Sequence, residues 1–230
     1  MAVRPLFISL PGKVGVEEKS IDFQWHPGMA ASQKKKSIAS LHQVAQQHGY
    51  ERLLEISSKS EDELGIKLSA FNLVIRTKKH GKEFTVETAF QGSKVFERGG
   101  PYKDLFGMNS LAAKKDIRLK ESGNLVKFKF FGQSFPLVPR TYFYDWLYIN
   151  ALVQNKSLAE QVLSFDGYTD IEFNPKKSIN CQAHAVALYV SLQKNNLVEE
   201  ALSSVQNFLN VTEHHYTSQT RNIGVQSSFI

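Results

Sequence analysis

Three polar side chains of different chemistry, Glu87, Gln91 and Lys94, lie at helical spacing inside an apolar stretch, residues 86–96. At about 100° per residue, positions i, i+4 and i+7 share one narrow stripe of an α-helix. The positions around this stripe are mostly apolar: Val86, Thr88, Ala89, Phe90, Val95 and Phe96. Because a buried charge is tolerated when it is paired or used, this combination indicates an internal cavity. The alternative is a buried Glu87–Lys94 ion pair that holds the core together.

Two further polar sets lie in apolar surroundings. Asp145 is the sole charge in the aromatic stretch 142–149, where it either caps another group or faces a pocket. Asn180 and His184, at i and i+4, share one face of a predicted helix, and His184 is either a hydrogen-bonded core residue or a catalyst. With the first set they supply carboxylate, amine, amide and aromatic groups, an inventory suited to binding and opening a sugar linkage.

Length and composition limit the classes of protein that fit. The 230 residues carry 42% apolar residues and contain no repeat or convincing linker, which favours one ordered domain. The single cysteine, Cys181, excludes an internal disulfide framework and suits a reducing cytoplasm. The apolar run 6–10 is too short for a secretion signal or a membrane span. A net charge of +6 and a pI near 9.2 favour polyanionic partners weakly.

Several catalytic and cofactor motifs are absent from the sequence. It has no phosphate-cradling glycine loop ending in Lys-Ser/Thr, no dinucleotide-binding glycine fingerprint and no Gly-x-Ser-x-Gly elbow. His214 and His215, with one distant cysteine, lack the spacing of metal ligands. We therefore expect no metal and no cofactor.

Helices outweigh strands and do not alternate regularly with them, which predicts a single α+β domain, mainly helical, with a small mixed or antiparallel sheet. Helices are predicted over 33–48, 86–96, 104–113, 142–154, 157–164, 179–194 and 197–209. Strands are predicted over 21–25, 52–57, 68–76, 117–121 and 125–131, with 170–174 extended and a turn at 78–82. Ser32 is expected to cap the first helix, and Ser157 with Glu160 to form a capping box.

The chain is expected to consist of three parts. Residues 1–31 show no clear periodicity and predict a meandering extension packed on the domain. Residues 32–209 form the main domain, and 210–230 a polar tail that is loose or a docking arm.

Two motifs of the sequence resemble the signature of the NADAR (YbiA-like) family. One is Ser69-Ala70-Phe71-Asn72, and the other is the helix that carries Glu87, Gln91 and Lys94. The pair Asp145-Trp146, the stretch Gln154-Asn155-x-x-Leu158 and Asn180 recur in the same order, so the resemblance spans about residues 68–195. It implies a YbiA-like fold. Two positions depart from the pattern: Thr88 replaces a histidine, and residues 170–175 replace an Asp-x-x-Trp-Gly segment.

The N-terminal part resembles the NADAR antitoxins encoded beside DarT-type DNA ADP-ribosyltransferase toxins. The segments that carry this resemblance are Trp25-His26-Pro27-Gly28, Ser32-Gln33-Lys34 and Glu55-Ile56-Ser57-Ser58-Lys59-Ser60. It implies an enzyme that removes ADP-ribose from guanine bases in DNA. The expected partners are therefore ADP-ribosylated DNA and a cognate toxin. The protein is expected to be a cytoplasmic monomer that does not bind a membrane.

The chemistry of the expected reaction assigns roles to individual residues. Lys94 is expected to be the amine that attacks the anomeric carbon, with its pKa lowered by apolar neighbours, and Glu87 the proton shuttle. The residues expected to bind substrate are Gln91, Asn72, Phe71, Trp146, Asp145, Lys59, Asn180 and His184. Lys59, Lys34 and Arg140 are the candidates for the diphosphate and the DNA backbone.

Two other functions fit the same residues. A YbiA-type N-glycosidase would act on small phosphorylated riboflavin precursors with shared chemistry. A non-catalytic immunity protein would silence the toxin by binding it, and the polar stripe would then be structural. Catalysis at substoichiometric amounts separates an enzyme from a binder.

Overall fold

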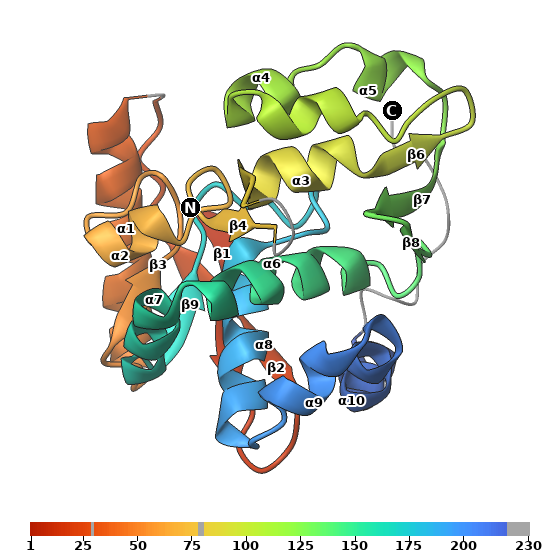
Figure 1. Ribbon diagram of the computed structural model, residues 1–230. Coiled ribbons are helices and arrows are strands. Elements are labelled where there is room, and N and C mark those ends of the chain that lie inside the picture. Colours follow the sequence, from red (N-terminus) through yellow and green to blue (C-terminus); the bar gives the residue numbers. More distant parts are fainter. Residues whose placement is uncertain (29, 78–80, 220–230) are drawn as a thin grey trace.

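A four-stranded mixed sheet brings together strands that lie far apart in the sequence (Figure 1). The computed structural model describes residues 1–28, 30–77 and 81–219. The strand order is β2-β1-β9-β3, with β1 (Ala2–Ser9), β2 (Val16–Phe23), β3 (Leu53–Glu55) and β9 (Gly167–Thr169). Because β9 pairs antiparallel with β1 and parallel with β3, a late strand completes a sheet that the N-terminus begins.

The hairpin of β1 and β2 replaces the meandering N-terminal segment that the sequence predicted, so this expectation is wrong. The chain reverses where the N–H of Leu10 donates to the carbonyl of Gly15 at 3.0 Å. Gly12 has a φ of +69° there, which glycine adopts without steric cost. Ile21 and Phe23 are buried at alternate positions of β2, which gives the strand its apolar face.

The larger sheet is covered by helices on both faces. Consecutive residues of a strand point to opposite faces, and Leu6 and Phe7 of β1 accordingly belong to different apolar clusters. Leu6 packs with Ile38 and Leu41 of α1 (Ala31–Gln47). Phe7 belongs to the main core, on the side of α8 (Gln182–Lys194). The sheet therefore ties the N-terminal hairpin to the main core.

Two small antiparallel sheets frame the first polar motif. β4 (Val74–Arg76) pairs with β5 (Glu83–Thr85), which leads directly into α3 (Val86–Gly92). The predicted turn joins β4 and β5, and its residues 78–80 lie outside the described residues. β6 (Lys94–Phe96), β7 (Leu125–Phe130) and β8 (Gln133–Phe135) form the second sheet.

α6 (Tyr142–Gln154) runs through the middle of the molecule, with α3 above it and α8 to α10 below it in Figure 1. Its bounds are those predicted from the sequence. Phe143 lies 4.7 Å from the rings of both Phe128 and Phe135, measured between centroids. At its C-terminal end, the Gln154 side chain accepts a hydrogen bond from the Arg76 N–H, and the Asn155 side chain donates to the Val74 carbonyl. Both of these side chains fix β4 against α6.

The α+β prediction is confirmed, with helix outweighing strand around small sheets. The remaining elements are α2 (Glu63–Lys67), η1 (Lys103–Gly107), α4 (Ser110–Lys114), α5 (Arg118–Glu121), α7 (Lys156–Gln161), η2 (Val162–Ser164), α9 (Val198–Ser203) and α10 (Val205–Ser218). None of the described helices is long and apolar enough to cross a membrane.

Local hydrogen bonds explain three segments that are not extended as the sequence predicted. The predicted strand 117–121 is instead helical, because the Asp116 carboxylate accepts the Arg118 N–H at 3.0 Å. Residues 69–72 form a turn rather than the start of a strand, with the Asn72 N–H bonded to the Ser69 carbonyl. Residues 170–174 turn because Asp170 accepts the N–H groups of Glu172 and Phe173.

Several helix boundaries also differ from the predictions. Ala30, not Ser32, precedes the first turn of α1, and Asn155 occupies the N-cap position that was assigned to Ser157. α8 begins at Gln182, so Asn180 lies outside it. The predicted helix 197–209 is divided at Ser204, which caps α10 by accepting the Asn207 N–H. α10 then continues to Ser218, where the sequence predicted a loose tail; residues 220–230 lie outside the described residues.

Candidate active site

α3 places Glu87 and Gln91 in the interior. Its N-terminus is fixed by Thr85, whose hydroxyl accepts the Thr88 N–H at 3.2 Å, and by the Glu87 N–H, which donates to the Ala70 carbonyl. All seven residues of α3 are buried. The Gln91 side-chain amide donates to Glu87 Oε1 at 2.8 Å, as the predicted i, i+4 spacing allows.

Lys94 reaches the same region by a different route from the one predicted. The helix ends at Gly92, and Lys94 begins strand β6, so a continuous helix over 86–96 is wrong. The Ser93 hydroxyl donates to the Ala89 carbonyl at 2.7 Å, and a Cβ at Gly92 would clash with the Phe106 ring. Lys94 Nζ nevertheless lies 5.0 Å from the centroid of the Phe90 ring.

Burial lowers the pKa of Lys94 to about 8, the direction that the sequence predicted. The Glu87 carboxylate opposes this shift, whereas the Lys114 ammonium adds to it. More of the Lys94 amine is therefore neutral near pH 7 than for an ordinary lysine. An amine of this kind is a usable nucleophile near neutral pH.

Glu87 does not form the predicted alternative ion pair with Lys94. Among the described residues, the ion pair of Glu87 within 4.0 Å is with Lys114 of α4, at 4.0 Å. Lys114 also lies 5.1 Å from the centroid of the Phe71 ring. The sequence analysis missed Lys114, since it lies 27 positions from Glu87 and belongs to none of the motifs.

Gln91 is left with an unused acceptor. Its side chain is 7% exposed, and its Oε1 atom is buried without a hydrogen-bond partner among the described residues. A buried carbonyl without a donor costs about 1–3 kcal/mol. The arrangement therefore suits a ligand that brings a hydroxyl or N–H group to this oxygen.

Thr88, where the resemblance expects histidine, belongs to the helix start. Its hydroxyl donates to the Thr85 carbonyl at 3.0 Å, and the side chain is 1% exposed. Thr85 in turn shares a hydrogen bond with Ser110, which donates to the Phe71 carbonyl. This chain of bonds fixes the position of α4, and with it Lys114, relative to α3.

Asp145 of α6 contacts His184 of α8, on the side of α6 opposite to α3 (Figure 1). Asp145 Oδ1 lies 3.2 Å from His184 Nδ1, and Oδ2 accepts the Tyr216 hydroxyl at 3.1 Å. His184 Nε2 contacts the Gln219 side chain at 2.9 Å, and the His184 and His215 rings stack at 5.2 Å. These contacts agree with the core reading of His184. Within the described residues, no hydrogen bond or ion pair joins this group to Glu87, Gln91 or Lys94.

Trp146, next to Asp145, packs against the hairpin of β7 and β8. Its ring lies 5.0 Å from Phe135 and 6.1 Å from Phe130, between centroids. Its indole nitrogen is buried without a partner in the described part of the chain, so Asp145 does not hold it. The indole N–H remains a donor that a ligand could use.

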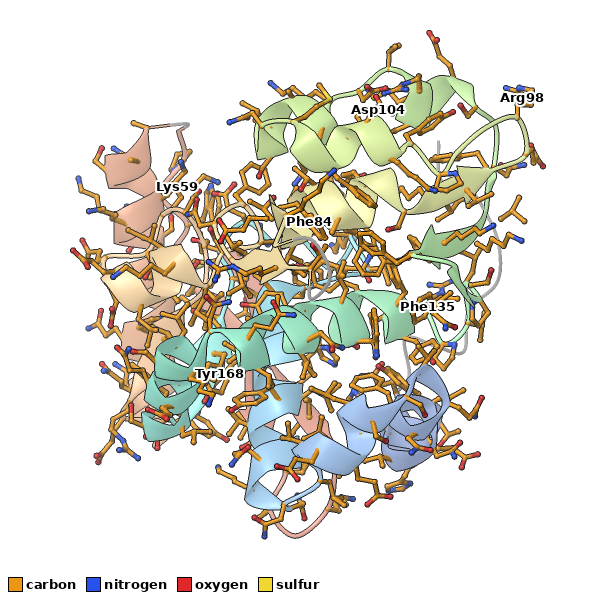
Figure 2. The ribbon with its side chains drawn as sticks, in the orientation of Figure 1. Lys59, Phe84, Arg98, Asp104, Phe135 and Tyr168 are labelled. Atoms are coloured by element: carbon orange, nitrogen blue, oxygen red, sulfur yellow. The ribbon has the colours of Figure 1, made fainter. Side chains whose placement is uncertain are left out.

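The other predicted ligand-binding residues are dispersed. Asn72 is exposed, and its amide nitrogen donates to the Ile66 carbonyl and the Ser69 hydroxyl within its own turn. Asn180 precedes α8 with its side-chain oxygen buried and unpartnered. In Figure 2, Lys59 lies beside α1 and α2, well apart from Phe84 next to α3. Lys34 is engaged by Glu172 at 3.4 Å.

A buried acid pair, Glu55 and Asp170, also escaped the sequence analysis. Burial and then the charge of Glu55 raise the pKa of Asp170 to about 8, and burial raises the pKa of Glu55. Glu55 accepts hydrogen bonds from the Thr169 hydroxyl at 2.6 Å and the Ile171 N–H at 2.8 Å. Burial raises the pKa of Tyr144, and the charges of Glu87 and Asp170 both add to this effect.

A comparison with protein families finds that the model described as DarT1-associated NADAR antitoxin matches residues 2–222. The match covers nearly the whole chain, including the N-terminal hairpin and α10. A comparison with curated proteins finds no match.

Proposed function

The chain belongs to the family of DarT1-associated NADAR antitoxins, and from this premise we propose that it is a hydrolase that removes ADP-ribose from guanine bases in DNA. Such an activity would reverse the mark left by a DNA ADP-ribosyltransferase toxin. The observation that carries the proposal is the group of Lys94, Glu87 and Gln91. It combines an amine of lowered pKa, a carboxylate and an unused acceptor in one interior region.

The bond to be broken joins the anomeric carbon of the ribose to the exocyclic amine of guanine. Opening of the sugar ring gives an iminium at this carbon, with a proton supplied to the ring oxygen by Glu87. The neutral Lys94 amine adds to the same carbon, and the guanine amine leaves with a proton. The resulting Schiff base is then hydrolysed by water, which returns the Lys94 amine and releases ADP-ribose.

The remaining groups bind rather than react. In this proposal the Gln91 carbonyl accepts a ribose hydroxyl, because it is the buried acceptor without a donor. The Trp146 ring would pack against the sugar or base. Its indole N–H, which has no partner in the described chain, would donate to the substrate. The net charge of +6 favours the DNA that carries the modified base.

The decisive experiment uses a single-stranded oligonucleotide that carries ADP-ribose on guanine. The purified protein, at substoichiometric amounts, should release ADP-ribose from it and leave thymidine-linked ADP-ribose intact. Borohydride added during turnover should trap an adduct on the wild type and none on Lys94→Ala. Release from riboflavin precursors alone would move the assignment to a small-molecule glycosidase. Silencing of the toxin at one-to-one stoichiometry, without ADP-ribose release, would indicate a binding antitoxin.

A further inference from the structure

Lys114 brings a second ammonium to the candidate active site from outside every predicted motif. Its Nζ atom lies 4.0 Å from Glu87 Oε1 and 5.1 Å from the centroid of the Phe71 ring. The Lys114 side chain is 55% exposed, whereas that of Glu87 is 8% exposed. Lys114 therefore stands where the buried carboxylate region meets solvent.

The contact between Lys114 and Glu87 is of the kind that exchanges easily. A separation of 4.0 Å is at the limit of an ion pair, and an exposed lysine on a flexible stem loses little when it changes partner. Glu87 Oε1 keeps the hydrogen bond from Gln91 when the ammonium leaves. An anion entering this region can consequently take Lys114 from Glu87 without leaving that oxygen unpartnered.

Phe71 keeps the ammonium nearby in either state. A cation over an aromatic face is attracted by the negative face of the ring, whichever anion it also contacts. The Phe71 backbone is itself held, because the Ser110 hydroxyl at the start of α4 donates to its carbonyl at 3.1 Å. The same helix thus carries Lys114 and fixes the ring beneath it.

We propose that Lys114 is the phosphate-binding residue of this site, holding the diphosphate of the ADP-ribosyl group while Lys94 attacks its ribose. This inference rests on the proposed function. The diphosphate is attached to the same ribose whose anomeric carbon reacts, so its cation must stand within one side-chain length of the reacting groups. Lys114 meets this requirement, because its ammonium lies 4.0 Å from the Glu87 carboxylate. Lys34, by comparison, is already engaged by Glu172 and lies over Trp25.

The exchange of partners has a consequence for the chemistry. Once Lys114 binds phosphate, Glu87 loses its ionic partner and becomes available to carry protons to and from the substrate. The substrate would in this way activate the site through its own diphosphate.

Lys114→Ala is the direct test, and Lys115→Ala is its matched control, since Lys115 is the adjacent exposed lysine. For an oligonucleotide with ADP-ribose on guanine, Lys114→Ala should raise KM by about 10- to 100-fold, the worth of one charge-assisted hydrogen bond. Lys115→Ala should stay within about twofold. With ribose alone on guanine, which has no diphosphate, the penalty of Lys114→Ala should disappear. An equal penalty on both substrates, or none on either, would overturn the inference.

Binding of free ADP-ribose, measured by calorimetry, tests the contact without turnover. Lys114→Ala should weaken it by about 10- to 100-fold, and Lys115→Ala should not. Unchanged affinity in Lys114→Ala would overturn the inference even for an active enzyme. A wild type that binds ADP-ribose through Lys114 but cleaves neither oligonucleotide would contradict the proposed function alone.

Discussion

Two polar clusters differ in how completely their hydrogen-bonding atoms are satisfied. One lies on α3 and β6, and the other joins α6 to α8 and α10, which lie on the other side of α6 from α3 in Figure 1. In the lower cluster, formed by Asp145, His184, His215 and Tyr216, both carboxylate oxygens and all four ring nitrogens have partners. In the upper cluster, formed by Glu87, Gln91 and Lys94, the Gln91 carbonyl has no donor within the described chain, and Lys94 has no ion pair there. Glu87 and Gln91 are about as buried as the lower cluster, whereas Lys94 is partly exposed, so completeness of hydrogen bonding and access to solvent both separate the two clusters.

Buried polar groups of these two kinds have different consequences for the protein. A network satisfied by its own chain stabilises and positions elements. The lower cluster does so by joining α6, α8 and α10, and His215 also accepts the Val16 N–H of the N-terminal hairpin. Burial lowers the pKa of His215 to about 2, so it stays neutral and can accept this bond. The upper cluster keeps a hydrogen-bond acceptor without a donor, which lowers the stability of the protein and suits a ligand that brings a donor.

Removal of the Lys94 amine should affect activity most. Lys94→Met should reduce ADP-ribose release to the detection limit without lowering the melting temperature at neutral pH. The physical reason is that the folded pKa of Lys94, about 8, lies below its unfolded value. Below pH 8 the charged amine therefore costs stability, a cost that shrinks as pH rises through the interval between the two pKa values. Lys94→Met removes this cost.

Turnover assays and thermal melts at pH 7 and pH 9 check this prediction. An active Lys94→Met protein, or one whose melting temperature falls steeply, would make the upper cluster as structural as the lower one.

Glu87→Gln is expected to have the next largest effect. It keeps the size of the side chain but removes the proton carrier, so kcat should fall about 10²- to 10⁴-fold. Affinity for substrate should survive, as measured with the inactive protein. Glu83→Gln, on the exposed side chain of β5, is the control and should retain wild-type turnover. Loss of stability in place of turnover would assign Glu87 to structure.

Gln91→Leu should have a moderate effect on activity. It removes the unused acceptor, so KM should rise about tenfold, the worth of one hydrogen bond to substrate. The lost carbonyl has no donor, but the variant also loses the hydrogen bond from the Gln91 amide to Glu87 Oε1, so the free energy of unfolding should fall by about 1–3 kcal/mol. Steady-state kinetics with a parallel melt check both expectations, and an unchanged KM would show that the carbonyl serves no ligand.

Tyr216→Phe should have the smallest effect on activity and a clear effect on stability. It leaves Asp145 Oδ2 without its hydroxyl donor, which should cost about 1–3 kcal/mol in the free energy of unfolding. Activity per folded molecule should stay within about twofold of the wild type. Urea unfolding and activity at matched folded concentration check the prediction. A large loss of activity from the folded variant would remove the distinction between the clusters.

The sequence predicted what local patterns determine. The bounds of α6 were predicted correctly because its own sequence is apolar on almost every side of the helix. The i, i+4 spacing of Glu87 and Gln91 likewise predicted their contact. The end of α3 was missed because it depends on Phe106 packing against Gly92 and on the pairing of Lys94 with β7. Neither contact has a local sequence signal.

Contacts between distant segments account for the other residues that were missed. Lys114 joins Glu87 through the packing of α4 on α3, and Glu55 meets the Asp170 region through the parallel pairing of β3 with β9. The N-terminal hairpin was missed for a different reason: its first strand carries Pro5, and charged residues fill much of its second strand. Its burial therefore depends on α1 and β9 and not on its own pattern.

The place of β9 between β1 and β3 determines when the protein can begin to work. During synthesis the N-terminal hairpin and β3 emerge early, but the strand that joins them follows more than a hundred residues later. At a translation rate of about 5–20 residues per second, they wait on the order of 10 seconds for it. Pairings this far apart in sequence also close slowly. A protein built in this order can act only after β9 has emerged, so its synthesis must begin well before its activity is needed.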